Sequence, residues 1–276
     1  MEKIQCCICE TTEYSRPYKF VDNYRLLKCR RCGLVYIDTR IDPESFMNDA
    51  KLDLNSSNNK KIEYWSFPGM YAKYNFVFLK YFNERFNRCI AFNRNIETMF
   101  DIGSGYGFWM DFCREKGLKV KGIDISDDAV CHSSKVLGLD VIKSPLKEYK
   151  FTESFDLYNM CDVIEHLENP NDELALLHEQ MKPTSLLYIQ VPDVLGIRIP
   201  YNHNLGLPHH IWQFNYKTAN KLLNKNGFRV LQKWHGVQGV IGCYVNDKVT
   251  LLRKLSWVGA EKFNIGNRLM LVCRKT

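Results

Sequence analysis

Between residues 97 and 226, short apolar runs alternate with longer amphipathic stretches. The apolar runs have the length of buried strands, and the stretches between them carry apolar residues at helical spacing. We expect strands at 97–102, 119–124, 139–143, 155–160 and 185–191. We expect helices at 105–116, 126–137, 172–181 and 217–226. Such an alternating order predicts an α/β fold with a parallel sheet.

The pattern changes on either side of this region. Two later apolar runs, 228–235 and 268–273, predict an antiparallel pair that closes the sheet. Ahead of the first strand, aromatic residues recur at helical spacing from Tyr71 to Phe82, which predicts a helix on the sheet edge. A polar stretch of low complexity predicts a linker. We therefore divide the chain into an N-terminal unit at 1–45, a linker at 46–63 and a main domain at 64–276.

The turn between the first strand and its helix is rich in glycine. It runs Asp101-Ile-Gly-Ser-Gly-Tyr-Gly-Phe-Trp109, one residue short of the dinucleotide-binding spacing. Glycine carries no Cβ atom, so the backbone can turn sharply here and approach a ligand closely. Such a loop at a strand-to-helix turn is typical of a cofactor site. Asp101 adds a carboxylate, which suits an amine-bearing ligand better than a pyrophosphate.

Two further strand ends carry polar groups. The second strand ends at Asp124, where a carboxylate can accept hydrogen bonds from ribose hydroxyls. The fourth strand is followed by Cys161-Asp-Val-Ile-Glu-His-Leu167, at the edge where α/β sheets bind ligands. A glycine loop alone is a weak signal, but the loop, the acid and this third segment together form a strong one.

This combination resembles the class I S-adenosylmethionine (SAM) dependent methyltransferases over roughly residues 65–276. The resemblance implies a Rossmann-like seven-stranded sheet with helices on both faces, and SAM as the cofactor. It places the methionine end at Asp101 and the glycine turn, the ribose at Asp124, and the adenine beside Leu146, without the acid that the family usually has there. The predicted cofactor-binding residues are Tyr71, Asp101, Gly103, Ser104, Gly105, Phe108, Asp124, Ile125, Leu146, Cys161 and Asp162.

Composition and charge indicate the class of protein and its possible location and partners. The 276 residues are 45% hydrophobic and 25% charged, as in ordinary soluble proteins. No apolar run approaches the ~18 residues that cross a bilayer, and the first residues lack the apolar core of a signal peptide. We therefore expect a cytoplasmic protein without a membrane span. Residues 217–276 carry 12 basic and two acidic groups, which suits a phosphorylated substrate, nucleic acid, a membrane surface or simply solvent.

The N-terminal unit contains two Cys-x2-Cys pairs, Cys6-Cys-Ile-Cys9 and Cys29-Arg-Arg-Cys32, separated by 19 residues. Two such pairs predict a four-thiolate zinc site on Cys6, Cys9, Cys29 and Cys32. Cys7 could replace Cys6 only by shortening the first pair to Cys-x-Cys. With strands expected at 24–28 and 34–37, we expect a small zinc ribbon, and we favour a structural role for it over a place in the substrate pocket.

A long segment at 193–215 separates the fifth strand from the next helix, and long loops in compact domains are usually functional. Methyl transfer from SAM is an in-line displacement that depends mainly on alignment. A hydroxyl or carbon nucleophile also needs a base, and histidine is the natural one. The alternative is that the loop histidines only make hydrogen bonds. The catalytic candidates are His209 and His210, followed by Tyr201, His203 and His166.

A zinc ribbon ahead of a SAM domain is similar to the sugar C-methyltransferases that act on nucleotide-linked keto-sugars. Those enzymes carry a further C-terminal domain for which this chain leaves no room, so O- or N-methylation of a surface-glycan or secondary-metabolite precursor stays equally open. We expect a small, phosphorylated or nucleotide-linked acceptor. The main alternative, an RNA base methyltransferase, is disfavoured by the nearly neutral ribbon and by the missing Asn/Asp-Pro-Pro motif. A non-catalytic SAM-binding protein is the third interpretation.

Overall fold

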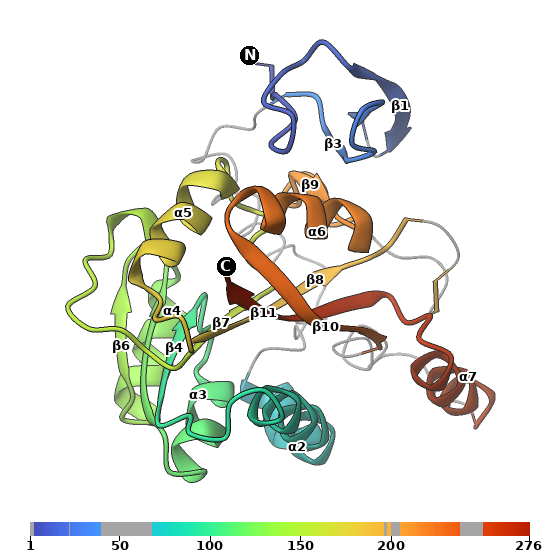
Figure 1. Cartoon of the computed structure of the whole chain (residues 1–276). Coiled ribbons are helices and arrows are strands. Elements are labelled where there is room, and N and C mark those ends of the chain that lie inside the picture. Colours follow the sequence, from blue (N-terminus) through green and yellow to red (C-terminus); the bar gives the residue numbers. More distant parts are fainter. Residues whose placement is uncertain (1–2, 22, 40–67, 196–197, 200–204, 238–250) are drawn as a thin grey trace.

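The computed structural model describes residues 3–21, 23–39, 68–195, 198–199, 205–237 and 251–276. Within these residues lies a seven-stranded sheet of order β10-β11-β8-β7-β4-β5-β6, with helices on both faces (Figure 1). Its strands are β4 (Thr98–Ile102), β5 (Lys119–Asp124), β6 (Asp140–Lys143), β7 (Leu157–Cys161), β8 (Leu186–Pro192), β10 (Phe228–Gly236) and β11 (Arg268–Lys275). The first five are parallel, and β11 pairs antiparallel with both β8 and β10. The predicted fold and the antiparallel closing pair are confirmed.

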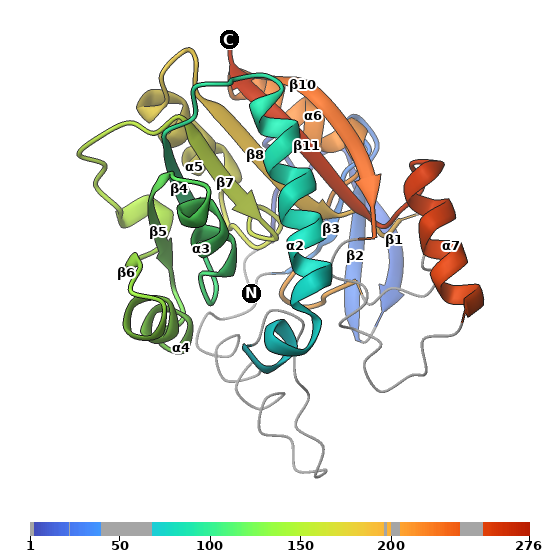
Figure 2. The same ribbon diagram turned by 90° about the horizontal axis from the view of Figure 1, so that it is seen from below.

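Helices cover the sheet in two layers. On one face lie α5 (Pro170–Gln180) and α6 (Tyr216–Lys225), between the sheet and the N-terminal unit, and on the other lie α2 (Pro68–Ile90) and α3 (Phe108–Glu115) (Figures 1 and 2). The predicted helix at 126–137 is α4 (Asp127–Cys131) continued by a π-helical turn at His132–Val136. Helix α7 (Leu251–Lys262) was not expected from the sequence. None of the described helices is both long and apolar enough to span a bilayer.

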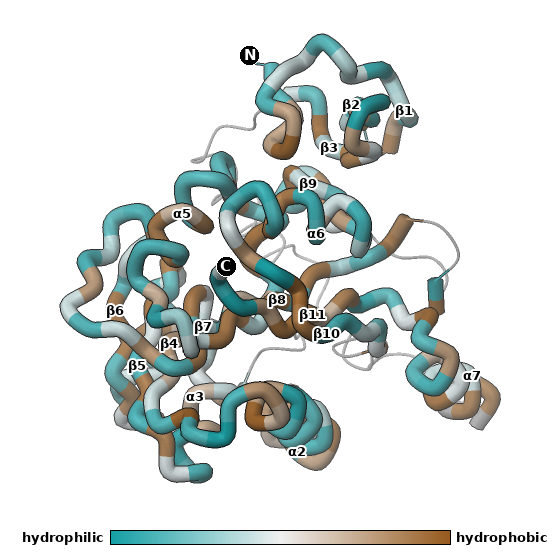
Figure 3. The backbone as a smooth tube through the Cα atoms, viewed as in Figure 1, coloured by the Kyte–Doolittle hydropathy of each residue, from teal (hydrophilic) through white to brown (hydrophobic). Residues whose placement is uncertain are grey.

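The core follows the alternation of side chains along the strands. Phe100, Tyr158 and Leu187 point to the face covered by α5 and α6, whereas their neighbours Met99, Leu157 and Leu186 join the cluster on the other face. All seven residues of β8 are buried, because helices cover this central strand on both sides. The hydropathy colouring accordingly shows central strands that are largely hydrophobic (Figure 3).

A second, four-stranded sheet has the order β1-β2-β3-β9. Three of its strands come from the N-terminal unit: β1 (Ser15–Val21), β2 (Tyr24–Cys29) and β3 (Val35–Ile37). The fourth, β9 (Trp212–Gln213), belongs to the segment at 193–215, and Tyr36 lies opposite Trp212 in the ladder. The strands at 24–28 and 34–37 are confirmed, whereas β1 and β9 were missed. The N-terminal unit therefore shares a sheet with the main domain.

The predicted domain boundaries stay a prediction. The linker at 46–63 and the aromatic residues Tyr64 and Trp65 lie outside the described residues. Within the described part, buried side chains of the N-terminal unit, such as Leu26 and Tyr36, belong to the same hydrophobic cluster as Phe214. The two units therefore pack against each other through a continuous core.

Candidate cofactor site

The glycine loop lies over the carboxyl end of β5. The amides of Gly103 and Ser104 donate to the carbonyl oxygen of Ile123 at 2.9 and 3.0 Å. Gly103 has a φ of 70°, and a Cβ atom there would lie 2.4 Å from Cγ2 of Val163. Gly107 has a φ of 84° and is the N-cap of α3, which starts at Phe108, three residues later than predicted. Backbone conformation and close packing both require glycine at these two positions.

Asp124 anchors this loop. Its Oδ2 atom accepts a hydrogen bond from the amide of Gly105 at 2.7 Å, and Oδ1 accepts from the amide of Ser126 at 2.8 Å. Each carboxylate oxygen has two lone pairs, so both oxygens can still accept from a ligand. The side chain lines a cavity of about 550 Å³, and its predicted contact with a ribose stays a prediction.

The glycine loop also lines a smaller cavity, of about 180 Å³. Asp101 lines it and is only 2% exposed, and this burial raises its pKa to about 7 although Asn159 donates a hydrogen bond to it. Arg85, which is 5% exposed, lines the same cavity and lies over the rings of Trp109 and Tyr188. The cavity thus presents an acid and a guanidinium together, which complements the zwitterionic end of an amino acid.

The predicted cofactor residues are divided between these two cavities, which meet at Gly103. The larger cavity contains Gly103, Asp124, Ile125 and Leu146. The smaller contains Asp101, Gly103, Ser104, Gly105, Phe108, Cys161 and Asp162. Tyr71 is not among the lining residues, but its ring stacks on Phe108 with centroids 3.9 Å apart. Arg85 was missed, because no motif marks a single arginine on a helix.

The three histidines that the structure describes among the catalytic candidates lie together. Nδ1 of His166 is 3.0 Å from the carbonyl oxygen of His209, and the ring of His166 meets that of His210 edge to face at 4.7 Å. Burial lowers the pKa of His210 to about 2, so its ring stays neutral and is a poor base. His166 and His209 line the larger cavity. Tyr201 and His203 lie outside the described residues.

The family of this chain follows from its similarity to known proteins. A family model described as a methyltransferase domain matches residues 71–233, more than half of the chain. The chain belongs to this methyltransferase-domain family. By family and by fold it is a class I SAM-dependent methyltransferase domain.

Two curated relatives of this methyltransferase domain are ubiquinone biosynthesis O-methyltransferases. The mitochondrial enzyme of Schizosaccharomyces pombe is 29% identical over 101 residues, which cover 34% of this chain and 37% of the relative. The enzyme of Saccharophagus degradans is 28% identical over 94 residues, which cover 32% and 40%. The matched region thus spans less than half the length of these relatives.

Solved structures share the methyltransferase fold. The 1,6-didemethyltoxoflavin-N1-methyltransferase of Burkholderia thailandensis, solved with bound 1,6-didemethyltoxoflavin and S-adenosylhomocysteine (SAH), aligns with a TM-score of 0.54 at 14% identity. That alignment covers 95% of this chain and 99% of the other. A SAM-dependent methyltransferase from Archaeoglobus fulgidus aligns with a TM-score of 0.51 at 22% identity, covering 74% and 100%. At these identities the likeness concerns the fold alone.

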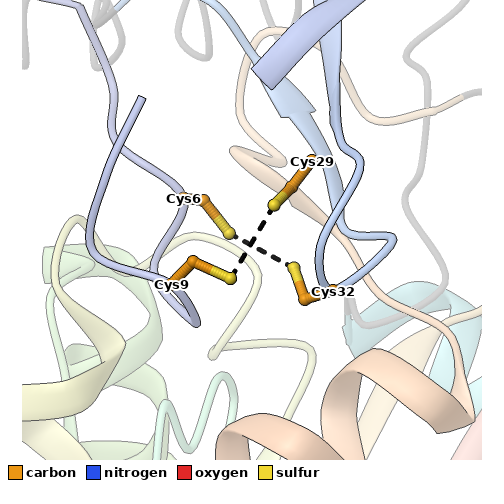
Figure 4. A group of neighbouring side chains, drawn as sticks. All are labelled: Cys6, Cys9, Cys29 and Cys32. Atoms are coloured by element: carbon orange, nitrogen blue, oxygen red, sulfur yellow. Dashed lines mark hydrogen bonds between the residues drawn. The ribbon is translucent and has the colours of Figure 1, made fainter. Parts of the chain in front are cut away.

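Two groups of side chains in the methyltransferase could hold a metal ion. The sulfur atoms of Cys6, Cys9, Cys29 and Cys32 all lie within 4.8 Å of one another (Figure 4). Cys6 and Cys32 are 3.4 Å apart and Cys9 and Cys29 3.8 Å apart, close to the edges of about 3.8 Å in a tetrahedron with zinc–sulfur bonds of about 2.3 Å. The second group is Glu165, His166 and His210, one carboxylate and two imidazoles.

The two cysteine pairs are docked on the helices of the main domain. Asn171 of α5 donates to the carbonyl oxygen of Cys7 at 2.8 Å, and Lys225 of α6 reaches the same oxygen at 3.4 Å. Lys221 donates to the carbonyl oxygen of Cys32 at 3.1 Å. In the same way, Lys275 binds carbonyl oxygens at the end of α5. Three of the 12 basic side chains in residues 217–276 are therefore bound to backbone carbonyl oxygens within the fold.

Proposed function

We propose that this methyltransferase transfers the methyl group of SAM to a small molecule. The observation that carries the proposal is the pair of cavities that meet at Gly103. Asp101 and Arg85 suit the ammonium and carboxylate groups of a bound methionine moiety, and Asp124 suits the ribose hydroxyls. We assign the remaining predicted cofactor residues to the same ligand, with Ile125 and Leu146 beside the adenine.

The acceptor is proposed to be a hydroxyl-bearing small molecule, with a nucleotide-linked sugar or a surface-glycan or secondary-metabolite precursor as the first class to test. The relatives named as O-methyltransferases support an oxygen acceptor. An RNA acceptor is less favoured, because Lys221, Lys225 and Lys275 are engaged with backbone carbonyls rather than free to grip phosphates.

His209 is the proposed base. When bound, SAM supplies an electrophilic methyl carbon on a sulfonium that leaves as a neutral thioether. The hydroxyl of the acceptor then loses its proton, and a neutral imidazole beside the cavity can take it. His209 lines the larger cavity, whereas the buried ring of His210 packs against His166. We therefore assign His210 and His166 to positioning the loop.

Replacing His209 with alanine should lower kcat about 100-fold, the usual contribution of a general base. The affinity for SAH should stay within about threefold, because the backbone carbonyl that holds His166 is retained. Steady-state kinetics with the identified acceptor and calorimetric titration with SAH give the two numbers. The control is His178→Ala, at the far end of α5, which should leave both values unchanged. Full activity of His209→Ala would remove the base assignment.

We also propose that Cys6, Cys9, Cys29 and Cys32 hold one structural zinc ion. Four thiolates at near-tetrahedral separations fit the preference of zinc. Free thiols and zinc ligands suit a reducing compartment, so we propose a cytoplasmic location. We likewise propose the unit at 1–45 as the zinc ribbon and the region from 64 to 276 as the SAM domain.

The cofactor proposal is tested by titrating the protein with SAH at several pH values. One SAH per chain should bind. The pKa of Asp101 is raised to about 7 by burial in the free protein, while the ammonium of SAH needs the ionised carboxylate. Affinity should therefore be highest above pH 7 and fall by up to about tenfold per pH unit below it. Asp101→Asn should bind more weakly and lose this dependence. Absence of binding, or a flat pH profile in the unmutated protein, would contradict the proposal.

A further inference from the structure

We propose that Glu173, on α5, accepts a hydrogen bond from the exocyclic amine of the adenine ring and so determines the base specificity of the cofactor site. The inference rests on the proposed function, because it concerns the same ligand. It assigns to α5 an acidic contact that the segment after β6 does not supply, since that segment reads Ser144-Pro145-Leu146 and contains no acid.

The Glu173 side chain is buried beside the larger cavity, with one oxygen unpaired in the part of the chain that the structure describes. It is 8% exposed, lines the larger cavity, and its Oε2 atom is buried without a hydrogen-bond partner among the described residues. A buried carboxylate oxygen without a donor is unfavourable for folding. A ligand that brings a hydrogen-bond donor would satisfy this oxygen, which accounts for its burial without a partner in the described structure.

The walls of the larger cavity match the chemical groups of adenosine. Asp124 is one acid on the wall, Glu173 is another, and apolar groups that include Leu146 and Ile211 line the same cavity. Adenosine has the matching order of groups: ribose hydroxyl donors, a flat apolar ring, and an amine donor on the outer edge. Ile125 also lines the cavity and is 51% exposed, a large apolar side chain that a purine ring would cover.

The neighbouring acids do not compete for this role. Glu168 and Asp172 line the same cavity but are exposed, so water already satisfies them. Asp172 in addition accepts a hydrogen bond from Asn169 at 2.6 Å. A hydrogen bond discriminates strongly between two ligands only where its loss leaves a buried group without a partner. Of these three acids, Glu173 is the buried one.

Position along the fold supports the same assignment. Helix α5 contacts the short 3₁₀ turn Leu146–Glu148 that follows β6. Burial raises the pKa of Glu173 to about 7, and nearby Lys147 partly opposes this shift. Both forms of the side chain suit adenine. The carboxylate accepts from the amine, and the protonated form can also donate to the adjacent ring nitrogen.

The test compares SAH with the analogue whose purine lacks the 6-amino group. The unmutated protein should bind SAH about 10- to 150-fold more tightly than the analogue, the range for a hydrogen bond to a charged group. Glu173→Ala should lose most of this preference, because SAH binds more weakly while the affinity for the analogue hardly changes. Glu173→Gln, which keeps the shape of the side chain but not its charge, should retain an intermediate preference. Calorimetric titration gives each dissociation constant.

Glu179→Ala is the matched control, since Glu179 is an exposed acid on the same helix outside the cavity. It should keep the full preference for SAH. An unchanged preference in both Glu173 variants would overturn the inference while leaving SAM binding intact. Failure of the unmutated protein to bind SAH would instead overturn the proposed function, and this inference with it. If Glu173→Ala does not fold, Glu173→Leu takes its place, because leucine fills similar space and carries no acceptor for the amine; a full preference for SAH in that variant would overturn the inference.

Discussion

Replacing Asp124 with alanine should weaken SAH binding about 1000-fold. Two ribose hydroxyls donating to a charged acceptor contribute about 2 kcal/mol each, and every 1.4 kcal/mol is a factor of about ten. The same carboxylate also holds the amides of Gly105 and Ser126, so its removal releases the glycine loop as well. Calorimetric titration of the purified variant with SAH measures the loss.

Two comparisons separate these contributions. An SAH analogue without the ribose 2′-hydroxyl should bind the unmutated protein about 10- to 100-fold more weakly than SAH, yet bind Asp124→Ala as well as SAH does. Asp127→Ala is the matched control, because Asp127 is a nearby acid with a 79% exposed side chain that pairs with Lys143. SAH affinity of Asp124→Ala within about threefold of the unmutated value would refute the ribose assignment.

The elements around the glycine loop could be predicted because their signals are local. Positive φ values at Gly103 and Gly107 need glycine, and apolar runs such as Leu186–Pro192 become strands buried on both faces. The alternating order of strands and helices along the chain then predicts that the strands form a parallel sheet. The start of α3 was predicted too early, because helical periodicity does not reveal that the loop continues through Gly107.

The missed features depend on contacts between distant segments. Arg85 lines the smaller cavity only because α2 packs on the sheet beside Trp109 and Tyr188. No local sequence pattern predicts that packing. The strand β9 has two residues, too few for any periodicity, and it forms because β3 lies alongside. His210 looked like a base in the sequence, but burial lowers its pKa to about 2 and changes its chemistry.

Replacing Cys29 with serine should abolish zinc binding and loosen the larger cavity. Cys29 ends β2, and β3 continues the same sheet to β9. The amide of Ile37 donates to the carbonyl oxygen of Ile211 at 3.1 Å, and both residues line the cavity. Structural zinc contributes on the order of 10 kcal/mol in small zinc domains, so the ribbon should unfold without it. Metal analysis should fall from one zinc per chain to none, and SAH affinity should drop about tenfold.

Cys131→Ser is the control for this variant, because Cys131 is an exposed thiol on α4 and should leave both values unchanged. Binding linkage provides an independent check: if zinc tightens SAH binding by a given factor, SAH must tighten zinc binding by the same factor. Competition with a chelator in the presence and absence of SAH measures that second factor. A folded Cys29→Ser protein that still binds one zinc would refute the four-thiolate site. Loss of zinc with unchanged SAH affinity would keep that site but separate the ribbon from the cofactor cavity.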